Sequence, residues 1–389
     1  MPRFISILLL AAAVVFRPAS LAASVSNSLD DPAFFPIAVW VQSPAHAQKY
    51  REAGINTYVG LWHGLTPEHL ESLQKAGIKI VCAQNSFALR QTGNSSIIAW
   101  MHGDEPDNAQ TLGSGKGYGP PILPEVIARN YQEMKKADPS RPVLLNFGQG
   151  VAWDNYIGRG VRRNHPEDYP EYLKGCDIAS FDIYPAVHED KEVAGKLEFV
   201  ARGVQRLGEW SGGKKRVWNC IECTRISNVK TKPTPEQVRA EVWMSLIHGS
   251  RGLIYFVHQF KPEFREAALL DDPEMLETVT ALNKQIIGLA PVLNSRSLDG
   301  LIEVKSAPES APVAAMVKRS GNDLYVFAVG MRGSPTRATF TLKPNAESSG
   351  LTQVFTEKGP IKLADGKWSD DFSAYGFHIY VLRVAAKRS

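Results

Sequence analysis

Apolar and polar positions alternate in blocks along roughly the first 290 residues of the chain. Short, almost continuously apolar runs, many of them rich in β-branched or aromatic residues, are mostly followed by stretches of helical periodicity. Such runs predict strands that are buried on both faces, as in a parallel sheet. The predicted strands are 36–41, 55–61, 78–83, 97–103, 142–148, 177–185, 216–222 and 252–258.

The stretches between these strands predict helices. Residues 66–77 are typical, with Thr66 as the cap, Pro67 in the first turn and Gly77 at the end. Alternating strands and helices indicate right-handed crossovers, and eight such units in about 255 residues fit a (β/α)8 barrel. The competing fold is a doubly wound open sheet, but its usual glycine-rich first turn is missing from "VWVQSPAH". We therefore expect an α/β fold, a TIM barrel over residues 30–290.

The pattern changes after Pro291. Segments such as "DLYVFAVGM", "TRATFTLKP" and "FHIYVLRV" are short or alternate between apolar and polar positions, and no helical pattern lies between them. This texture is typical of antiparallel strands joined by turns. We expect a C-terminal antiparallel β-sandwich domain over residues 298–386.

The first 22 residues have the pattern of a signal peptide. Arg3 supplies a positive start, residues 7–16 are apolar, and residues 20–22 offer the small side chains that a signal peptidase needs. Ten apolar residues are too few to span a bilayer. We expect a secreted or periplasmic protein that has no membrane segment after signal removal.

Composition narrows the possible partners. Apolar residues make up 44% of the chain, the net charge is +4 and no long basic run occurs, which disfavours nucleic acid as a partner. Cys220 and Cys223 form a C-x-x-C within a strand, but no second ligand pair at zinc spacing accompanies them. We interpret the cysteines as small buried apolar residues and expect no metal and no cofactor. The oligomeric state stays open.

Barrel enzymes carry their chemistry at the carboxyl ends of the strands. In this sequence the fourth strand ends at Asp104 and Glu105, the sixth contains Asp182, and the seventh ends at Glu222. Aromatic rings stack on sugars, while amides and carboxylates bind hydroxyl groups. Further candidate binding residues at the strand ends are Trp40, Trp62, His63, Asn85, Asn146, Tyr184 and His258. We therefore predict a carbohydrate substrate.

The arrangement resembles the clan A glycoside hydrolases, which have a (β/α)8 barrel with a glutamate at the end of strand 4 and another at the end of strand 7. By this resemblance Glu105 is the acid/base and Glu222 the nucleophile of a retaining glycosidase, which cleaves an O-glycosidic bond by double displacement. Tyr184 matches a position where the clan often has an aromatic residue near the nucleophile. The resemblance covers about residues 34–290 and does not identify a subfamily.

Asp104 departs from the clan's usual pattern, which has asparagine before the acid/base. An ionised aspartate accepts hydrogen bonds from sugar hydroxyls but cannot donate one. Its charge next to Glu105 would raise the pKa of that carboxyl, as a general acid requires. Two alternatives stay open. A non-catalytic carbohydrate-binding barrel would keep the aromatics without needing paired glutamates, and a metal-dependent hydrolase would use histidines such as His63, His102 and His258.

Overall fold

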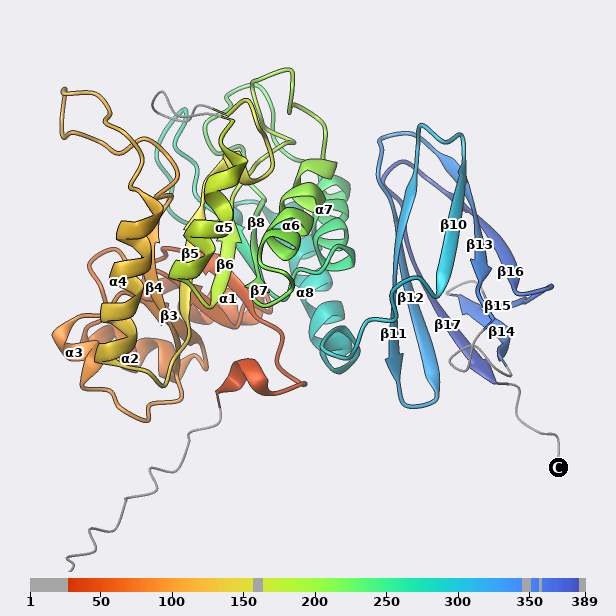
Figure 1. Cartoon of the computed structure of the whole chain (residues 1–389), viewed down its shortest axis with the longest axis horizontal. Helices are drawn as coiled ribbons and strands as arrows, with labels where there is room; N and C mark the ends of the chain where they lie inside the picture. The colour runs from red at the N-terminus through yellow and green to blue at the C-terminus, as the bar shows by residue number, and fades with distance from the viewer. Residues whose placement is uncertain (1–26, 157–163, 345–350, 357–358, 385–389) are drawn as a thin grey trace, which may run out of the picture.

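The chain forms a barrel and a β-sandwich that lie side by side (Figure 1). The structure is a computed structural model that describes residues 27–156, 164–344, 351–356 and 359–384. The predicted signal peptide, residues 1–22, lies outside this range. Within it, no helix combines the length and the hydrophobicity needed to cross a membrane.

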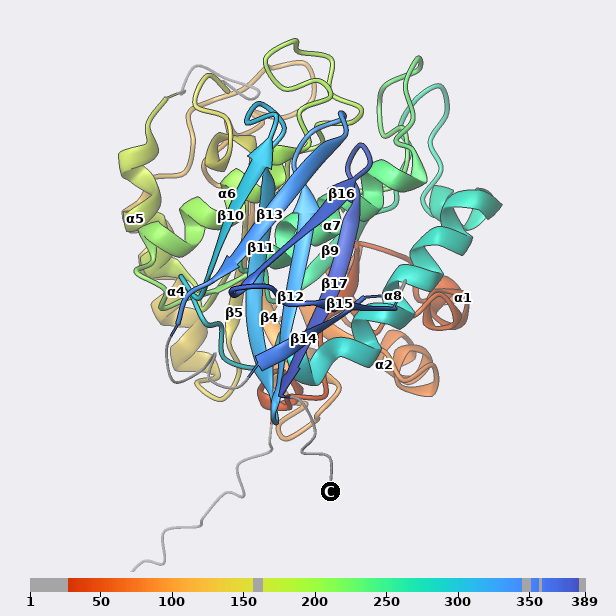
Figure 2. The same ribbon diagram turned by 90° about the vertical axis from the view of Figure 1, so that its right-hand side faces the viewer.

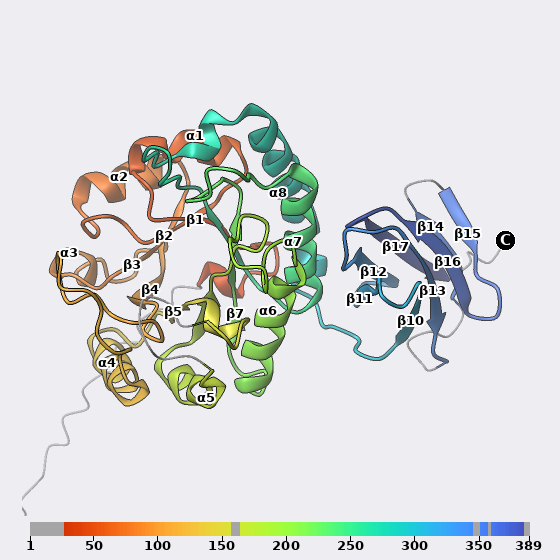
Figure 3. The same cartoon turned by 90° about the horizontal axis from the view of Figure 1, so that it is seen from above.

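The barrel is a closed ring of parallel strands, as the sequence predicts, and Figure 3 shows it from above with helices around the outside. The strands follow the order β7-β6-β5-β4-β3-β2-β1-β9-β8. They are β1 Ile37–Trp40, β2 Thr57–Val59, β3 Lys79–Cys82, β4 Ile97–Asp104, β5 Val143–Phe147, β6 Ile178–Phe181, β7 Arg216–Val217, β8 Asn219–Glu222 and β9 Leu253–Phe256.

Helices connect these strands and cover the outer face of the barrel (Figure 3). Short 3-10 turns at Ser28–Asp30, Pro44–His46, Gln149–Val151, Pro166–Asp168, Leu173–Gly175 and Ala268–Asp271 join or extend them. The α-helices are α1 Ala47–Glu52, α2 Pro67–Lys75, α3 Ser86–Leu89, α4 Pro124–Ala137, α5 Tyr169–Tyr172, α6 Glu198–Trp210, α7 Pro235–Ile247 and α8 Pro273–Leu293.

Two apolar layers build the barrel. Alternate strand residues such as Ala38, Ile98 and Trp218 fill the interior, and their neighbours face the helices. Tight packing requires small residues where elements approach each other closely. A Cβ atom on Gly203 of α6 would lie 2.2 Å from the ring of Phe181 on β6, so only glycine fits there.

The C-terminal domain is a two-sheet antiparallel sandwich, which confirms the predicted fold class. One sheet has the order β10-β13-β16 and the other β11-β12-β17-β14-β15. Phe340 and Trp368 stack at 4.8 Å in the core between them. The strands are β10 Ile302–Ala307, β11 Val313–Ser320, β12 Asp323–Gly330, β13 Thr336–Leu342, β14 Leu351–Thr356, β15 Gly359–Lys362, β16 Lys367–Phe372 and β17 Phe377–Val384.

Helix α7 lies on the side of the barrel that the sandwich covers, and in Figure 2 it is seen behind the sandwich strands. Apolar residues occur all around this helix because both faces are covered. Trp243 is fully buried and stacks on Phe377 at 3.8 Å and on Phe327 at 5.6 Å, both from the sandwich. The two domains therefore share one continuous apolar core through α7.

Several element boundaries differ from the sequence prediction. The seventh strand is split at Trp218, where the backbone N–H turns to the carbonyl of Ala179 at 2.9 Å and closes the ring between β6 and β8. Helix α6 begins only at Glu198, because turns occupy the residues between β6 and this point. Helix α8 continues past Pro291 to Leu293, since a proline in the last turn removes little helical bonding. The short elements α3, β10, β15 and β16 were not predicted.

Candidate active site

Strand β4 delivers two adjacent carboxylates to the mouth of the barrel. The pairing of β4 with β5 shifts between Met101 and Asp104, and Glu105 has a φ of 43°, a left-handed conformation that is uncommon outside glycine. The Glu105 N–H still donates to the Asn146 carbonyl at 2.9 Å, so β5 holds the turn in place. Bulges and left-handed residues of this kind redirect side chains at the end of a strand. Here they direct two carboxylates toward the mouth.

Asp104 is exposed, but a side-chain relay across three strands restrains it. Asn146 donates from Nδ2 to Asp104 Oδ1 at 3.0 Å, and its own Oδ1 accepts a hydrogen bond from Ser180 Oγ at 2.7 Å. Because the Ser180 hydroxyl occupies the amide oxygen, the Asn146 amide group faces Asp104. The structure thus brings together Asp104 and Asn146, two of the predicted binding residues.

Asp182, which follows β6, forms the other half of a carboxyl pair with Glu105. Burial first, and then the charges of Glu105 and Asp104, hold the pKa of Asp182 well above its ordinary value. Tyr184 donates to Asp182 Oδ2 at 3.3 Å, whereas Oδ1 is enclosed and meets no donor among the described residues. A proton on Asp182 accounts for the missing donor at Oδ1, because the acid form of Asp182 can hydrogen-bond to the Glu105 side chain. Protonated Asp182 therefore faces a carboxylate acceptor.

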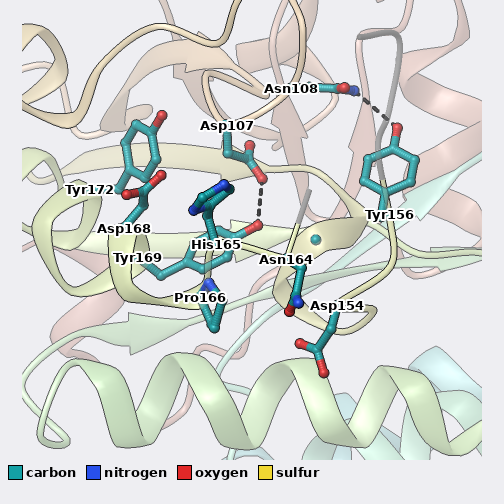
Figure 4. Close-up of a pocket in the computed structure, with 11 residues that line it drawn as sticks. Asp107, Asn108, Asp154, Tyr156, Asn164, His165, Pro166, Asp168, Tyr169 and Tyr172 are labelled. Carbon is teal, nitrogen blue, oxygen red and sulfur yellow. Dashed lines mark hydrogen bonds between the residues drawn. The ribbon is translucent and has the colours of Figure 1, made fainter. Parts of the chain in front are cut away.

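Asp107 is a third carboxylate nearby, and it anchors the loop after β4. It accepts the Gly148 N–H at 3.0 and 3.2 Å and the Tyr169 hydroxyl at 2.9 Å (Figure 4). Burial raises the pKa of Asp107 to about 7, and the Glu105 charge adds to this effect. The adjoining cavity has a volume of only about 30 Å³, enough for a water molecule rather than a sugar.

A larger groove of about 610 Å³ opens beside Tyr156 and Tyr184, and neither Glu105 nor Asp182 belongs to its lining. Trp153, Tyr156, Tyr184 and His188 contribute rings to its lining. The two tyrosine hydroxyls reach the carboxylates. Tyr184 donates to Asp182, and Tyr156 accepts from the Asn108 amide at 3.1 Å, which also donates to Glu105 at 3.0 Å. The groove thus combines aromatic faces with polar groups aimed at one reacting region.

Glu222 does not line this groove. It is fully buried, and its two oxygens accept the backbone N–H groups of Ala186 at 2.6 Å and Val187 at 3.0 Å. Its side chain also hydrogen-bonds to Glu241 of α7. Burial raises the pKa of Glu222 to about 7, although the backbone and Glu241 hydrogen bonds counteract part of this rise. The carboxylate ties the loop that follows β6 to the end of β8.

The remaining predicted binding residues have different environments. Trp40 is buried in the barrel interior, and Asn85 caps α3, where it accepts the Ala88 N–H at 2.7 Å. These two side chains are engaged within the fold. Trp62 and His63 are exposed at the rim, whereas His258 is buried beneath Trp62 with the ring centroids 5.7 Å apart.

Sequence reasoning missed several site residues. Asp107 lies only two positions after Glu105, and a third carboxylate in "DEPD" was a usable signal. Glu241 was visible as a charge inside an apolar helix, "VRAEVWMSLI", which indicates a buried ionisable group. Tyr156, Trp153 and His188 stand on irregular loops, where no periodic pattern predicts orientation.

The described residues contain no group of three or more His, Cys, Asp or Glu side chains that could hold a metal ion. The four cysteines are buried and unpaired. Cys220 faces the barrel interior, and Cys223, just beyond the end of β8, faces the helix layer.

Neither a family model nor a curated protein matches the chain. Solved structures do match. An alpha-amylase from Geobacillus thermoleovorans in complex with acarbose is 10% identical, with a TM-score of 0.55 over 90% of this chain and 99% of its own. A noncanonic maltogenic alpha-amylase from Thermotoga neapolitana is 7% identical, with a TM-score of 0.53 over 90% and 99%.

The chain therefore shares the fold of these two amylase structures. The likeness extends over nine-tenths of this chain, so it includes the C-terminal sandwich as well as the barrel. At such low identity it concerns the fold alone. Activity has to be argued from the side chains at the mouth of the barrel.

Proposed function

We propose that this protein is a retaining glycoside hydrolase that acts on an oligo- or polysaccharide, with Glu105 and Asp182 as its working carboxyl pair. One observation carries the proposal. Two carboxyls, one at the end of β4 and one following β6, hydrogen-bond to each other at the mouth of the barrel, and the raised pKa of Asp182 favours its acid form. The aromatic groove of about 610 Å³ beside Tyr156 and Tyr184 offers room for sugar rings.

Asp182 is assigned as the general acid. Because burial and two neighbouring carboxylates raise its pKa, Asp182 keeps its proton near neutral pH and donates it to the departing glycosidic oxygen. Glu105 then attacks the anomeric carbon as a carboxylate, oriented by the Asn108 amide at 3.0 Å, and forms a glycosyl ester. In the second step Asp182 takes a proton from water, which attacks that ester and releases the sugar.

The contact between the two carboxyls does not fit an inverting enzyme, in which roughly 6.5–9.5 Å leaves room for water. A retaining reaction requires the two groups to separate to about 5–5.5 Å around the glycosidic bond. This assignment changes the roles inferred from the clan resemblance, where Glu105 is the acid/base. Glu222 as nucleophile stays a prediction, and that role would require its enclosed carboxylate to open toward the groove.

The test uses three isosteric variants, Asp182→Asn, Glu105→Gln and Glu222→Gln, assayed on aryl glycosides and polysaccharides. We expect the first two to lose at least about 100-fold in kcat, because each removes a proton donor or a nucleophile. Glu222→Gln should retain the wild-type kcat and change mainly KM, because it disturbs the loop whose N–H groups at Ala186 and Val187 bind the carboxylate. NMR of the first-formed anomer reports retention or inversion.

Several outcomes would contradict the proposal. Near wild-type rates in Asp182→Asn and Glu105→Gln would exclude this pair, and abolished turnover in Glu222→Gln alone would restore the clan assignment. Binding of sugars without turnover by the wild type would favour the carbohydrate-binding barrel. Loss of activity on chelation would favour the metal-dependent hydrolase.

We also infer export of the protein, with residues 1–22 removed. The support is the apolar run behind Arg3, which is too short to span a bilayer. N-terminal sequencing of the protein recovered from the cell envelope or the medium tests this inference. A mature chain that still begins at Met1 would contradict it.

A further inference from the structure

Exposed aromatic side chains gather at the mouth of the barrel, away from the groove described above. Trp62, Phe260 and Phe264 are 52%, 46% and 56% exposed. They stand on the loops after β2 and β9, which flank β1 in the ring. Large apolar side chains that remain in water at one place mark a binding surface more often than a structural feature.

Trp62 is held in position although it is exposed. Its indole N–H donates to Glu266 Oε1 at 2.7 Å, and the Ser43 N–H donates to the same oxygen at 2.7 Å. Glu266 is thus fixed by the backbone after β1 and fixes the indole in turn. A rigid exposed ring loses little conformational entropy when a ligand stacks on it.

His258 joins the exposed rings into one surface. It is buried and lies edge-on to Trp62, with 5.7 Å between centroids. Its ring lies nearly parallel to Phe260 at 6.0 Å, and Phe264 follows at 6.2 Å. Burial lowers the pKa of His258, which favours the uncharged ring. The imidazole therefore packs here as an aromatic group.

The same surface reaches the carboxyl pair. Phe256, at the end of β9, lies 6.1 Å from Phe260 and 5.1 Å from Tyr184. The Tyr184 hydroxyl contacts Asp182. An unbroken series of ring contacts thus crosses the mouth from Asp182 to Trp62. We call these six side chains the aromatic run: Tyr184, Phe256, His258, Phe260, Phe264 and Trp62.

We propose that the aromatic run is a carbohydrate subsite that binds non-reacting pyranose units of an oligosaccharide whose scissile bond lies at Glu105 and Asp182. This inference rests on the proposed function and adds to it where the non-reacting units of the sugar chain bind. Pyranose rings present apolar C–H faces that stack on aromatic rings and equatorial hydroxyls that need acceptors. The exposed rings supply the stacking faces, and Glu266 supplies an acceptor next to Trp62.

A sugar chain fits this surface better than a protein partner does. A stable protein interface needs about 800 Å² from each partner. The aromatic run is instead a narrow series of rings that ends at a carboxyl pair. Glu266 Oε2 has His46 Nε2 at 3.9 Å as its nearest ion-pair partner, beyond hydrogen-bonding distance, so it retains acceptor capacity for a hydroxyl.

The experiment measures binding against chain length. Gluco-, galacto- and xylo-oligosaccharides of one to six units, α- and β-linked, are titrated calorimetrically into the full chain. The variants are Trp62→Ala, Phe264→Ala and Phe264→Leu, of which the last keeps apolar volume but removes the ring face. Ile287→Ala, which removes an exposed apolar side chain from the outer helix α8, is the matched control.

We expect the affinity of the wild type to rise with chain length in at least one series. Trp62→Ala and Phe264→Ala should each weaken binding of the longer members about ten-fold, with a smaller loss for the monosaccharide. Phe264→Leu should resemble Phe264→Ala, and Ile287→Ala should resemble the wild type. Wild-type affinity for long chains in both alanine variants, or no binding of any series by the wild type, would overturn the subsite.

Hydrolysis of aryl monosaccharides separates this inference from the proposed function. Length-dependent binding that requires Trp62 and Phe264, without hydrolysis of any substrate, would leave the subsite standing and refute the glycosidase. Hydrolysis by the wild type together with length-independent binding would refute the subsite alone.

Discussion

Replacing Glu241 by glutamine tests the buried carboxyl pair between β8 and α7. Glu241 and Glu222 are both fully buried and hydrogen-bonded to each other. Glu222 already accepts two backbone N–H groups, whereas neither oxygen of Glu241 meets a donor in the described part of the chain. The arrangement is satisfied when Glu241 is the acid and donates its proton to ionised Glu222.

The size of the effect follows from the pKa of the pair. Burial raises the pKa of Glu222 from 4.5 to about 7, and burial together with the Glu222 charge raises the pKa of Glu241 well above its ordinary value. The folded protein then holds a proton that the unfolded chain releases, so the free energy of unfolding falls as pH rises from about 4.5 to the folded pKa. Each unit by which the pKa of the proton-holding group lies above its ordinary value corresponds to about 1.4 kcal/mol.

Glutamine in place of Glu241 offers Glu222 an amide donor that needs no proton. Glu241→Gln should therefore match the wild type in stability near pH 4.5 and exceed it by about 1–3 kcal/mol near pH 8. Urea titrations at several pH values measure this difference, in which the contributions of other titrating groups cancel. Glu236→Gln, on the exposed first turn of α7, is the control and should shift stability equally at every pH.

The reasoning would be refuted by a Glu241→Gln protein that is less stable than the wild type by the same amount at both ends of the pH range. That result would mean that the pair stays ionised or neutral throughout. The lack of hydrogen-bond donors around the two Glu241 oxygens would then have no explanation.

Two further predictions follow from the site and the domain interface. Asp104→Asn removes a charge that raises the pKa of Asp182, so the alkaline limb of the pH profile of kcat/KM should move to lower pH by up to about one unit. An unmoved limb would show that the charge of Asp104 does not affect the pKa of Asp182. Trp243→Ala should lower the free energy of unfolding by about 3–5 kcal/mol, because it removes the ring that stacks on Phe377 and Phe327. In calorimetry the two domains should then unfold in separate transitions. A single transition at the wild-type temperature would exclude the shared core.

The barrel could be predicted because its determinants are local. Each strand is a short apolar run, and each connection has its own start and stop signals, as Thr66 and Pro67 do for α2. The missed elements lack these signals. Strand β16, "KWSDDF", carries charged residues because one of its faces is solvated, and α3 is a single turn capped by Asn85. The side chain of Asn85, a predicted sugar-binding residue, caps that turn.

Glu222 shows the limit of strand-end reasoning at the site. Its position at the end of the seventh strand was predicted, and its neighbour Cys220 does face the barrel interior. The direction of the carboxylate depends on two N–H groups some 35 residues earlier and on Glu241 of the following helix. No periodicity encodes such contacts. Asp182 sits within a strand run in the sequence, and only the structure places it against Glu105.

Backbone strain links the carboxyl pair to the aromatic run. The β-branched residues with positive φ in the described chain are Val41 and Ile226, and both lie just beyond strand ends at the mouth, as does Glu105. Such conformations cost on the order of 1–3 kcal/mol each and persist where the surroundings hold them. The Val41 carbonyl contacts His258 Nε2 at 3.1 Å, and the Ile226 carbonyl accepts the Phe260 N–H at 2.6 Å.

Each strained residue therefore positions one part of the proposed site. Val41 and Ile226 hold two members of the aromatic run, and the turn at Glu105 presents one of the reacting carboxylates. Glycine would adopt all three conformations at lower strain. Stability alone would favour glycine at the φ of 43° that Glu105 adopts. A glutamate at this position therefore indicates that its side chain has a function. The strain at the mouth is thus independent support for placing the chemistry at Glu105.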